Sequence, residues 1–317
     1  MIYLILVVSL IGIVLGADWL VSGSVSIAKR FRVSEFVIGA AIVGVGTSMP
    51  ELVVSFIGAL QGNSDVAIGN VVGSNIFNVL GILGLTAVFF PIAIDKANMR
   101  FEIPYCIFVS IVLTLMAFNF FVNDIPVIGR IDGVILLILF AIFMWYSFHR
   151  DAKQKAEITE TKRENPDNSK EKPVWMAIAT VIVGLAILIT SCDIFVDKAV
   201  QIAKNWGMSE AVISITLIAC GTSLPELAAS IAAAIKKNTQ MALGNIVGSN
   251  IFNISLILGL SSQVTPLTSA GITLTDYLVM IGAAVLTLLF GFRGKIDRAS
   301  GLFMVACFIV YNIYLLN

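Results

Sequence analysis

Long apolar segments, separated by short polar turns, account for most of this chain. Each segment is long enough to cross a bilayer as a helix, which takes about 20 residues. The longest polar stretch, residues 149–173, follows the fifth segment. The pattern therefore predicts an all-α integral membrane protein in which two five-helix units, 1–148 and 174–317, flank a polar linker. The ten predicted transmembrane helices cover residues 2–27, 34–60, 66–91, 103–122, 127–148, 174–201, 209–235, 241–264, 272–291 and 299–316.

The two units repeat each other. Residues 17–85 align with 192–260 without a gap, and about half of the positions are identical. Because each unit contributes an odd number of spans, the second must enter the membrane upside down relative to the first. Inverted repeats of this kind are typical of secondary transporters. Duplication in a structural protein would give the same alignment, but the most similar segments here are polar and lie mid-membrane. They are GTSMPEL (46–52) with GTSLPEL (221–227), and GNVVGSNIFN (69–78) with GNIVGSNIFN (244–253).

Composition and charge narrow the class of protein further. Hydrophobic residues make up 58% of the chain, charged residues 13%, and the mean hydropathy is +0.96, whereas soluble domains carry about 25% charged residues. The formal net charge of zero gives no electrostatic footprint for nucleic acid. Of the 20 basic residues, all but Arg130, Lys198 and Lys204 fall in loops on one side of the predicted layout. Because basic loops stay in the cytoplasm, we expect a multi-pass cell-membrane protein with a cytoplasmic linker and both termini outside.

Two acidic residues stand out because they interrupt apolar spans. Glu51 and Glu226 lie about halfway along the second and seventh spans. A carboxylate at the centre of a membrane helix costs roughly 2.5–3.5 kcal/mol, so such residues usually face a pathway or a partner. No Lys or Arg lies at comparable depth in the repeat segments, and two carboxylates related by a pseudo-two-fold repel each other unless they are protonated or bridged by a cation. We therefore expect a divalent cation between them; a protonated, hydrogen-bonded pair is the structural alternative.

A proline precedes each of these glutamates. Pro50 and Pro225 have no N–H, so they leave the carbonyls of Gly46 and Gly221 unpaired and distort their helices. Broken membrane helices are tolerated where the freed backbone lines a cavity, and backbone carbonyls serve as ligands for calcium. An ordinary proline kink is the alternative, but it does not explain the repetition beside a glutamate in both halves.

Hydroxyl and amide side chains surround the glutamates at helical spacings. The hydroxyls of the broken spans are Thr47, Ser48, Thr222 and Ser223, and the ligand candidates of the following spans are Ser74, Asn78, Ser249 and Asn253. Asn70 and Asn245, next to GxxxG pairs, are better explained as contacts that hold neighbouring helices together. Two such units offer a cage of oxygen atoms with two negative charges. Soft ligands are missing from these motifs, which favours a hard cation over zinc or copper.

These paired motifs resemble the two alpha-repeats of the calcium/cation antiporter superfamily, and they are most similar to its prokaryotic sodium/calcium exchanger branch. The resemblance implies four cation sites at the membrane centre, one for calcium and up to three for sodium. It assigns the calcium carboxylates to Glu51 and Glu226, and the backbone carbonyls that add to them to Thr47 and Thr222. It assigns the flanking sodium sites to Ser48, Ser74, Ser223 and Ser249 with the backbones of Gly44 and Ala219, and the middle of the site to Asn78 and Asn253.

The resemblance predicts an antiporter that exchanges sodium for calcium by alternating access, with both ions bound as substrates and no prosthetic group. Some sodium/calcium members carry an aspartate where this chain has Asn253, and the branch that exchanges protons for calcium also relies on two glutamates. A proton/calcium antiporter is therefore the nearest alternative, and a cation channel is a second. No Ser–His pair or comparable nucleophile lies mid-membrane, so we do not expect an enzyme. The oligomeric state is not readable from the sequence.

Overall fold

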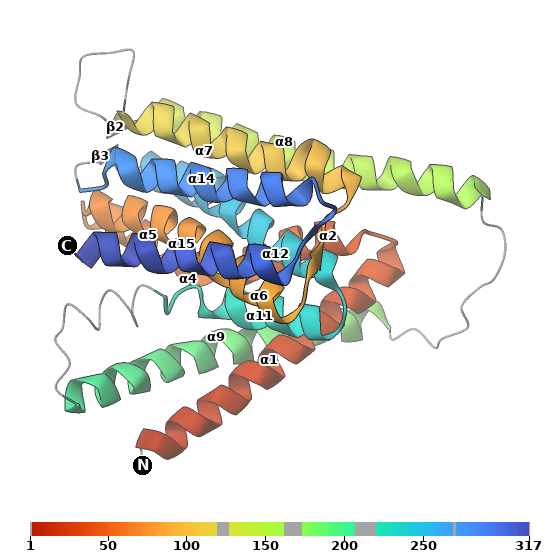
Figure 1. Ribbon diagram of the computed structural model, residues 1–317, viewed down its shortest axis with the longest axis horizontal. Helices are drawn as coiled ribbons and strands as arrows, with labels where there is room; N and C mark the ends of the chain where they lie inside the picture. Colours follow the sequence, from red (N-terminus) through yellow and green to blue (C-terminus); the bar gives the residue numbers. More distant parts are fainter. Residues whose placement is uncertain (1, 119–126, 162–172, 207–219, 269–270, 317) are drawn as a thin grey trace.

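A computed structural model describes residues 2–118, 127–161, 173–206, 220–268 and 271–316, and these residues are almost entirely helical (Figure 1). Within these ranges, eight helices are long and apolar enough to cross a membrane, and a ninth span is a bent pair of helices. The all-α, multi-span prediction is therefore confirmed. The count of ten stays a prediction, because residues 207–219, which include the start of the predicted seventh span, lie outside the described residues.

The first half begins with one long helix and then a span broken into four pieces. Its elements are α1 (Ile2–Phe31), α2 (Glu35–Ile38), the π-helical η1 (Gly39–Gly44), α3 (Val45–Thr47), α4 (Met49–Leu60), α5 (Ser64–Ile76), η2 (Phe77–Leu83), α6 (Gly84–Phe89), η3 (Asn98–Glu102), α7 (Ile103–Phe118) and α8 (Arg130–Thr161). The predicted start of the fifth span at residue 127 is wrong, because Val127 and Ile128 form a short strand before the helix begins. At its other end α8 continues to Thr161, into the stretch predicted as linker.

The second half reproduces this order where it is described. Its elements are α9 (Val174–Asn205), α11 (Leu224–Ile235), α12 (Thr239–Phe252), η5 (Asn253–Ile257), α13 (Leu258–Val264), α14 (Leu274–Gly291) and α15 (Arg298–Leu316). The π-helical turns η2 and η5 begin within one residue of each other in the repeat, at Phe77 and Asn253, where the GSNIF motif ends. These π-helical turns were not predicted from the sequence. Such turns are rare and are frequently found at functional sites.

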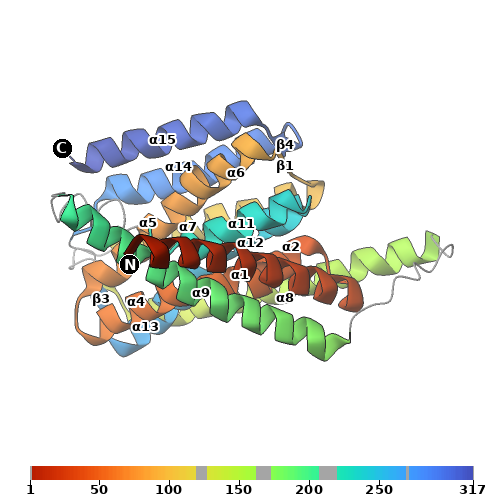
Figure 2. The ribbon, with the colours of Figure 1, turned by 90° about the horizontal axis from the view of Figure 1, so that it is seen from below.

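Two small antiparallel sheets tie the halves together. Strand β1 (Ile92–Ala93) pairs with β4 (Lys295–Ile296), and β2 (Val127–Ile128) pairs with β3 (Leu267–Thr268). Each sheet therefore joins one strand from the first half to one from the second. The two sheets lie at opposite ends of the helical bundle (Figure 2).

The second span bends by 50° between Thr47 and Met49. Pro50 occupies the first turn of α4, where its missing N–H costs nothing, so the proline fits the start of a new helix and not the interior of a continuous one. Ser48, at the break, has φ −83° and ψ 11°, which is no longer helical. The distortion expected from Pro50 is therefore confirmed, and it places Glu51 in the first turn of the new helix α4.

Glycines let the central helices approach one another closely. Gly16 on α1 and Gly184 on α9 face backbone of the opposite helix, so that a Cβ on Gly16 would lie 2.6 Å from the amide nitrogen of Leu188. Gly244 and Gly248 on α12 contact the backbone of α2 and η1 in the same way, which confirms the packing role expected for this GxxxG pair. The helices α1 and α9 lie side by side along one flank of the molecule (Figures 1 and 2).

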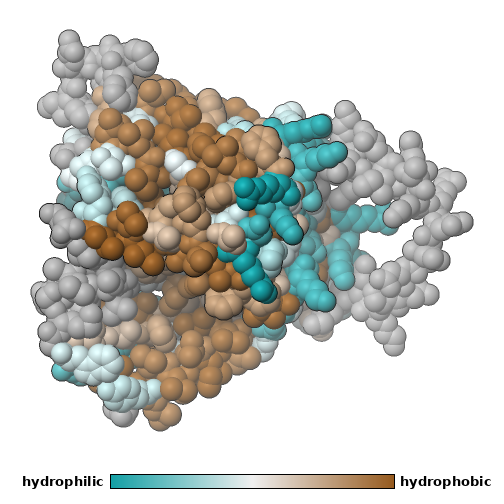
Figure 3. All heavy atoms as spheres, viewed as in Figure 1, coloured by the Kyte–Doolittle hydropathy of each residue, from teal (hydrophilic) through white to brown (hydrophobic). Residues whose placement is uncertain are grey.

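The surface has the distribution expected of a membrane protein. Brown, hydrophobic residues cover the middle of the face shown in Figure 3, and the most hydrophilic side chains gather at the end of the bundle where β1 and β4 lie. Trp145, Trp175 and Phe292 are among the large apolar side chains that are more than half exposed. In a lipid environment this exposure has no solvation cost.

Candidate cation-binding site

The break in the second span brings the two halves into contact through their acidic residues. The hydroxyl of Ser48 donates a hydrogen bond to Oε1 of Glu226 at 2.7 Å, and the hydroxyl of Ser223 donates to Oε1 of Glu51 at 2.8 Å. These four side chains have no solvent exposure. Each carboxylate is therefore held by a serine from the opposite half, and the two contacts are related by the internal repeat.

Each of these carboxylates keeps one oxygen atom without a partner. Oε2 of Glu51 and Oε2 of Glu226 are buried and accept no hydrogen bond, and Oδ1 of Asn78 and Oδ1 of Asn253 are in the same condition. A buried acceptor left unsatisfied costs about 1–3 kcal/mol. These four oxygens occupy two pairs of equivalent positions in the repeat.

The amides of Asn70 and Asn245 fasten each acidic helix to the next one. Nδ2 of Asn70 donates to the backbone oxygen of Glu51 at 3.2 Å and to Ser55 at 2.9 Å. Nδ2 of Asn245 makes the equivalent bonds to the backbone oxygen of Glu226 at 3.1 Å and to Ser230 at 2.8 Å. This is the helix-to-helix role expected for the two asparagines. It also fixes the backbone from which each carboxylate projects.

The threonine and serine candidates differ in what their hydroxyls contact. The Thr47 hydroxyl donates to the backbone oxygen of Val43 at 2.9 Å. The Ser249 hydroxyl donates to the backbone oxygen of Gly44 at 3.2 Å, so those two predicted partners are brought together. Ser74 bonds within its own helix, to the oxygen of Val71 at 3.1 Å.

Thr222 lies in the turn before α11 and is half-buried, whereas Thr47 has no exposure. Ala219 lies outside the described residues.

A second pair of asparagines, not among the residues predicted for the site, lies at the contact between the halves beside Asn78 and Asn253. Asn75 and Asn250 are buried and follow Ser74 and Ser249 in the repeated GSN motif. Their amides bond across the interface between the halves and contact Asn78 and Asn253. Their identity at equivalent positions of the repeat was the available signal. They are offset by one residue from the polar series Asn70, Ser74 and Asn78 and from its equivalent in the second half, which the helical spacing identifies.

No basic side chain neutralises the glutamates among the described ion pairs. The pairs Arg150–Glu102, Lys198–Asp197 and Lys236–Asp18 all lie elsewhere. The described residues contain no group of three or more His, Cys, Asp or Glu side chains arranged around a metal. Any cation held here must therefore use two carboxylates together with neutral amide, hydroxyl and backbone oxygens, as hard cations do in proteins.

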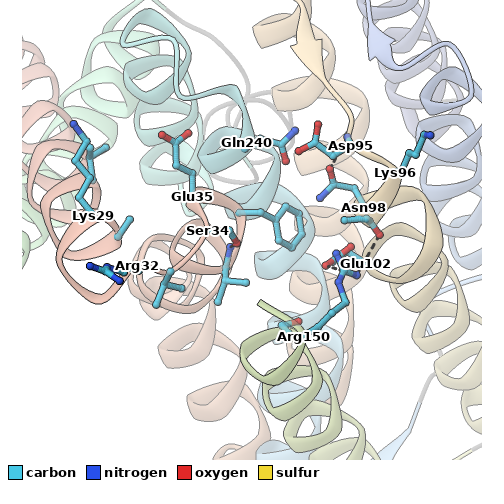
Figure 4. A pocket seen from close by; sticks show the side chains of 17 residues that line it. Lys29, Arg32, Ser34, Glu35, Asp95, Lys96, Asn98, Glu102, Arg150 and Gln240 are labelled. Atoms are coloured by element: carbon cyan, nitrogen blue, oxygen red, sulfur yellow. Dashed lines mark hydrogen bonds and ion pairs between the residues drawn. The ribbon is translucent and has the colours of Figure 1, made fainter. Parts of the chain in front are cut away.

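A cavity of about 770 Å³ opens at the end of the molecule where α1 ends and α2 begins (Figure 4). Lys29 and Arg32 lie on one wall, Asp95 lies opposite, and Glu102 pairs with Arg150 at 3.2 Å. The helical run 35–47 starts in this cavity and ends beside Ser48, roughly 20 Å away at about 1.5 Å per residue. The cavity is thus separate from the site around the glutamates.

Comparison with known proteins assigns this architecture to a family. The model of the sodium/calcium exchanger protein family matches residues 1–149 and 176–317, in two segments that leave out the stretch between the halves. The chain belongs to the sodium/calcium exchanger family. It is a transmembrane protein of the prokaryotic branch of the calcium/cation antiporters, a family of ion exchangers rather than of catalytic enzymes.

Full-length relatives support this membership. The chain is 39% identical to the protein CaxA of Alkalimonas amylolytica, over 97% of both chains. It is 31% identical to the sodium/calcium exchanger MaX1 of Methanosarcina acetivorans, over 99% of this chain and 98% of that one. A solved structure of the sodium-calcium exchanger NCX_Mj superposes with a TM-score of 0.84 at 33% identity and covers 99% of this chain and 100% of that one. The resemblance drawn from the two repeated motifs is therefore confirmed.

Proposed function

We propose that this exchanger-family protein is a secondary active antiporter that moves calcium in one direction and sodium in the other by alternating access. The observation that carries the proposal is the pair of buried carboxylates, Glu51 and Glu226, each held by a serine of the opposite half and each with one oxygen free of any partner. MaX1 and NCX_Mj, which cover almost the whole chain, are named for sodium and calcium exchange.

Calcium fits this site because of the oxygen atoms it offers. Calcium takes roughly six to eight oxygen ligands at about 2.3–2.6 Å. The unpaired oxygens of Glu51, Glu226, Asn78 and Asn253 supply four of them. The backbone carbonyls of Thr47 and Thr222 are the further ligands we assign to calcium. Two carboxylates make the site neutral when it holds one divalent cation.

Sodium competes for the same region through neutral oxygens. Ser48 and Ser223 lie against the carboxylates, and Ser249 lies against the carbonyl of Gly44. We assign the flanking sodium sites to these hydroxyls, to Ser74, and to the backbones of Gly44 and Ala219. Occupation of these sites by sodium would redirect the serine hydroxyls and weaken calcium binding, which couples the two ions.

Alternating access follows from the repeat and from the cost of charge in lipid. We infer ten spans in two inverted five-helix units, with a cytoplasmic linker and both termini outside. The two sheets at opposite ends of the bundle, each pairing a strand from one half with a strand from the other, support this arrangement. An empty site with two ionised carboxylates is costly to carry across the membrane, so only ion-loaded forms interconvert. The helices α1 and α9 are the moving elements.

A proton-coupled antiporter is the alternative that a specific observation favours. Positions 78 and 253 both hold asparagine, so the site has two carboxylates only, and protonation of both would neutralise it as one calcium ion does. The two readings differ in the ion that drives calcium movement, and a transport assay separates them.

The test is calcium-45 uptake into proteoliposomes that contain the purified protein. Vesicles are loaded with sodium, with potassium, or with potassium at low internal pH, and diluted into sodium-free medium that contains calcium. We expect uptake from the sodium-loaded vesicles and at most background from the other two. Uptake driven by low internal pH in the absence of sodium would show that the protein is a proton/calcium antiporter. Uptake from all three would indicate a channel, and Glu51→Gln vesicles provide the matched inactive control.

A further inference from the structure

We propose that Asn75 and Asn250 are positioning residues that orient the amides of Asn78 and Asn253, so that each presents its oxygen, and not its nitrogen, to the bound cation. Asn75 lies on α5 and Asn250 on α12, and both are buried at the contact between the halves. This inference rests on the proposed cation exchange and adds to it two residues that contact no ion themselves.

The first step is a reciprocal pair of bonds that fixes the amides of Asn75 and Asn250. Nδ2 of Asn75 donates to the backbone oxygen of Asn250 at 3.1 Å, and Nδ2 of Asn250 donates to the backbone oxygen of Asn75 at 3.2 Å. A backbone carbonyl only accepts hydrogen bonds. The atom facing it must therefore be the amide nitrogen, and the orientation of both side chains is determined without ambiguity. We call this reciprocal pair the asparagine clasp.

The fixed amides of Asn75 and Asn250 in turn determine how the amides of Asn78 and Asn253 are oriented. Since its nitrogen is committed, the clasp asparagine has only its oxygen left to contact the next amide. Oδ1 of Asn250 accepts from Nδ2 of Asn78 at 3.0 Å, and Oδ1 of Asn75 accepts from Nδ2 of Asn253 at 3.1 Å. If the amide of Asn78 or Asn253 were flipped, its oxygen would face the oxygen of the clasp asparagine. The Asn253 nitrogen also donates to the Ser74 hydroxyl at 3.2 Å, which agrees with this assignment.

The clasp leaves the side-chain oxygens of Asn78 and Asn253 free for a cation. With both nitrogens held by the clasp, Oδ1 of Asn78 and Oδ1 of Asn253 are the buried atoms left without partners. A free asparagine amide could present either atom, and its N–H would repel a cation. The clasp therefore prepares two neutral oxygen ligands in advance, which lowers the reorganisation required when an ion binds.

A double-mutant cycle tests the proposal, with calcium dissociation constants measured by titration calorimetry on purified protein. Asn250→Leu removes the clasp oxygen and Asn78→Ala removes the ligand that it orients. We expect each single change to weaken calcium binding by about tenfold, the size of one buried polar contact. If Asn250 acts through Asn78, the double variant binds no more weakly than Asn78→Ala alone. Asn98→Leu, which removes a buried asparagine outside the site, serves as control and should leave the constant unchanged.

Effects that multiply in the double variant would overturn the proposal, because they would place Asn250 in the general packing of the interface. Thermal unfolding checks each variant, and Asn250→Ala replaces Asn250→Leu if leucine is too bulky. Failure of both Asn250 variants to fold would equally overturn it, since the clasp predicts a loss of binding without a loss of fold. If the wild-type protein bound neither calcium nor sodium, the proposed function itself would be refuted. If the wild type binds calcium but the effects of the two substitutions multiply, only the role of the clasp is refuted.

Discussion

Glu51→Gln should stabilise the ion-free protein while abolishing its response to calcium. In the structure Glu51 is fully buried, its Oε1 accepts from Ser223 at 2.8 Å, and its Oε2 has no partner. Glutamine has the same shape and keeps the acceptor that faces Ser223. The substitution therefore removes one negative charge and little else.

The magnitudes follow from that single charge. A charged side chain at the centre of a membrane helix costs roughly 2.5–3.5 kcal/mol, and the neutral glutamine still has one unpaired polar atom. We therefore expect the free energy of unfolding without ions to rise by about 1–2 kcal/mol. Binding changes in the other direction, because two unit charges about 4 Å apart near a protein site interact by about 4 kcal/mol. Loss of one such interaction weakens calcium binding by about a thousandfold.

Thermal unfolding of detergent-purified protein, with and without calcium, measures both effects. Calcium should raise the melting temperature of the wild type, because a ligand stabilises the state that binds it. The Glu51→Gln protein should melt at a higher temperature than the ion-free wild type and show no shift with calcium. Glu102→Gln is the matched control. It removes the partner of Arg150 at 3.2 Å, so it should lower the melting temperature and keep the calcium shift.

A calcium shift of wild-type size in Glu51→Gln would refute the ligand role of this residue. If Glu51→Gln melted at a lower temperature than the ion-free wild type, as the control should, the empty site would not be destabilised by repulsion between the charges of Glu51 and Glu226. That result would instead favour a carboxyl pair that is already protonated and hydrogen-bonded.

Three further changes test the repeat, the coupling and the packing. Ser48→Ala and Ser223→Ala remove equivalent hydrogen bonds of 2.7 and 2.8 Å. Each should therefore weaken calcium binding, measured by calorimetry, by about tenfold. Two effects that differ from each other by more than tenfold would contradict the symmetry of the site. Lys236→Met removes a 2.6 Å ion pair that ties α11 to α1. Because the tie is partly exposed, exchange should speed up by only about threefold with an unchanged calcium KM, and a changed KM would argue against a role in helix movement. Gly244→Ala places a methyl group against the backbone of α2 and should cost about 1–3 kcal/mol of stability in thermal unfolding, whereas Gly282→Ala, with open space around it, should cost less than 1 kcal/mol.

Much of the architecture was readable because the bilayer imposes strict rules on sequence. Apolar segments of sufficient length identified the spans that the structure describes, and Pro50 identified the break that the structure places at Ser48. The contact of Glu51 with the opposite half was expected from the repeat, since equivalent motifs of two inverted units are predicted to meet at one axis. The roles of Asn70 and Asn245 followed from their position beside the GxxxG motifs.

Other features could not be read because they depend on contacts between the halves. The exchange of serines, with Ser48 on Glu226 and Ser223 on Glu51, is a choice of partner that spacing along one helix does not reveal. The clasp of Asn75 and Asn250 depends on how α5 and α12 cross. The extension of α8 to Thr161 was missed for a different reason: polarity marked this stretch as a linker, whereas its Ala, Lys, Gln and Glu residues are good helix formers.

Anomalous diffraction from crystals soaked in a heavier divalent cation, such as strontium, locates the ion directly. We predict one principal peak between Glu51 and Glu226, within coordination distance of an oxygen from each, that fades as sodium in the soak is raised. A peak bound elsewhere, or one at this position that is indifferent to sodium, would contradict the central claim that the two halves hold the exchanged cations at one shared site.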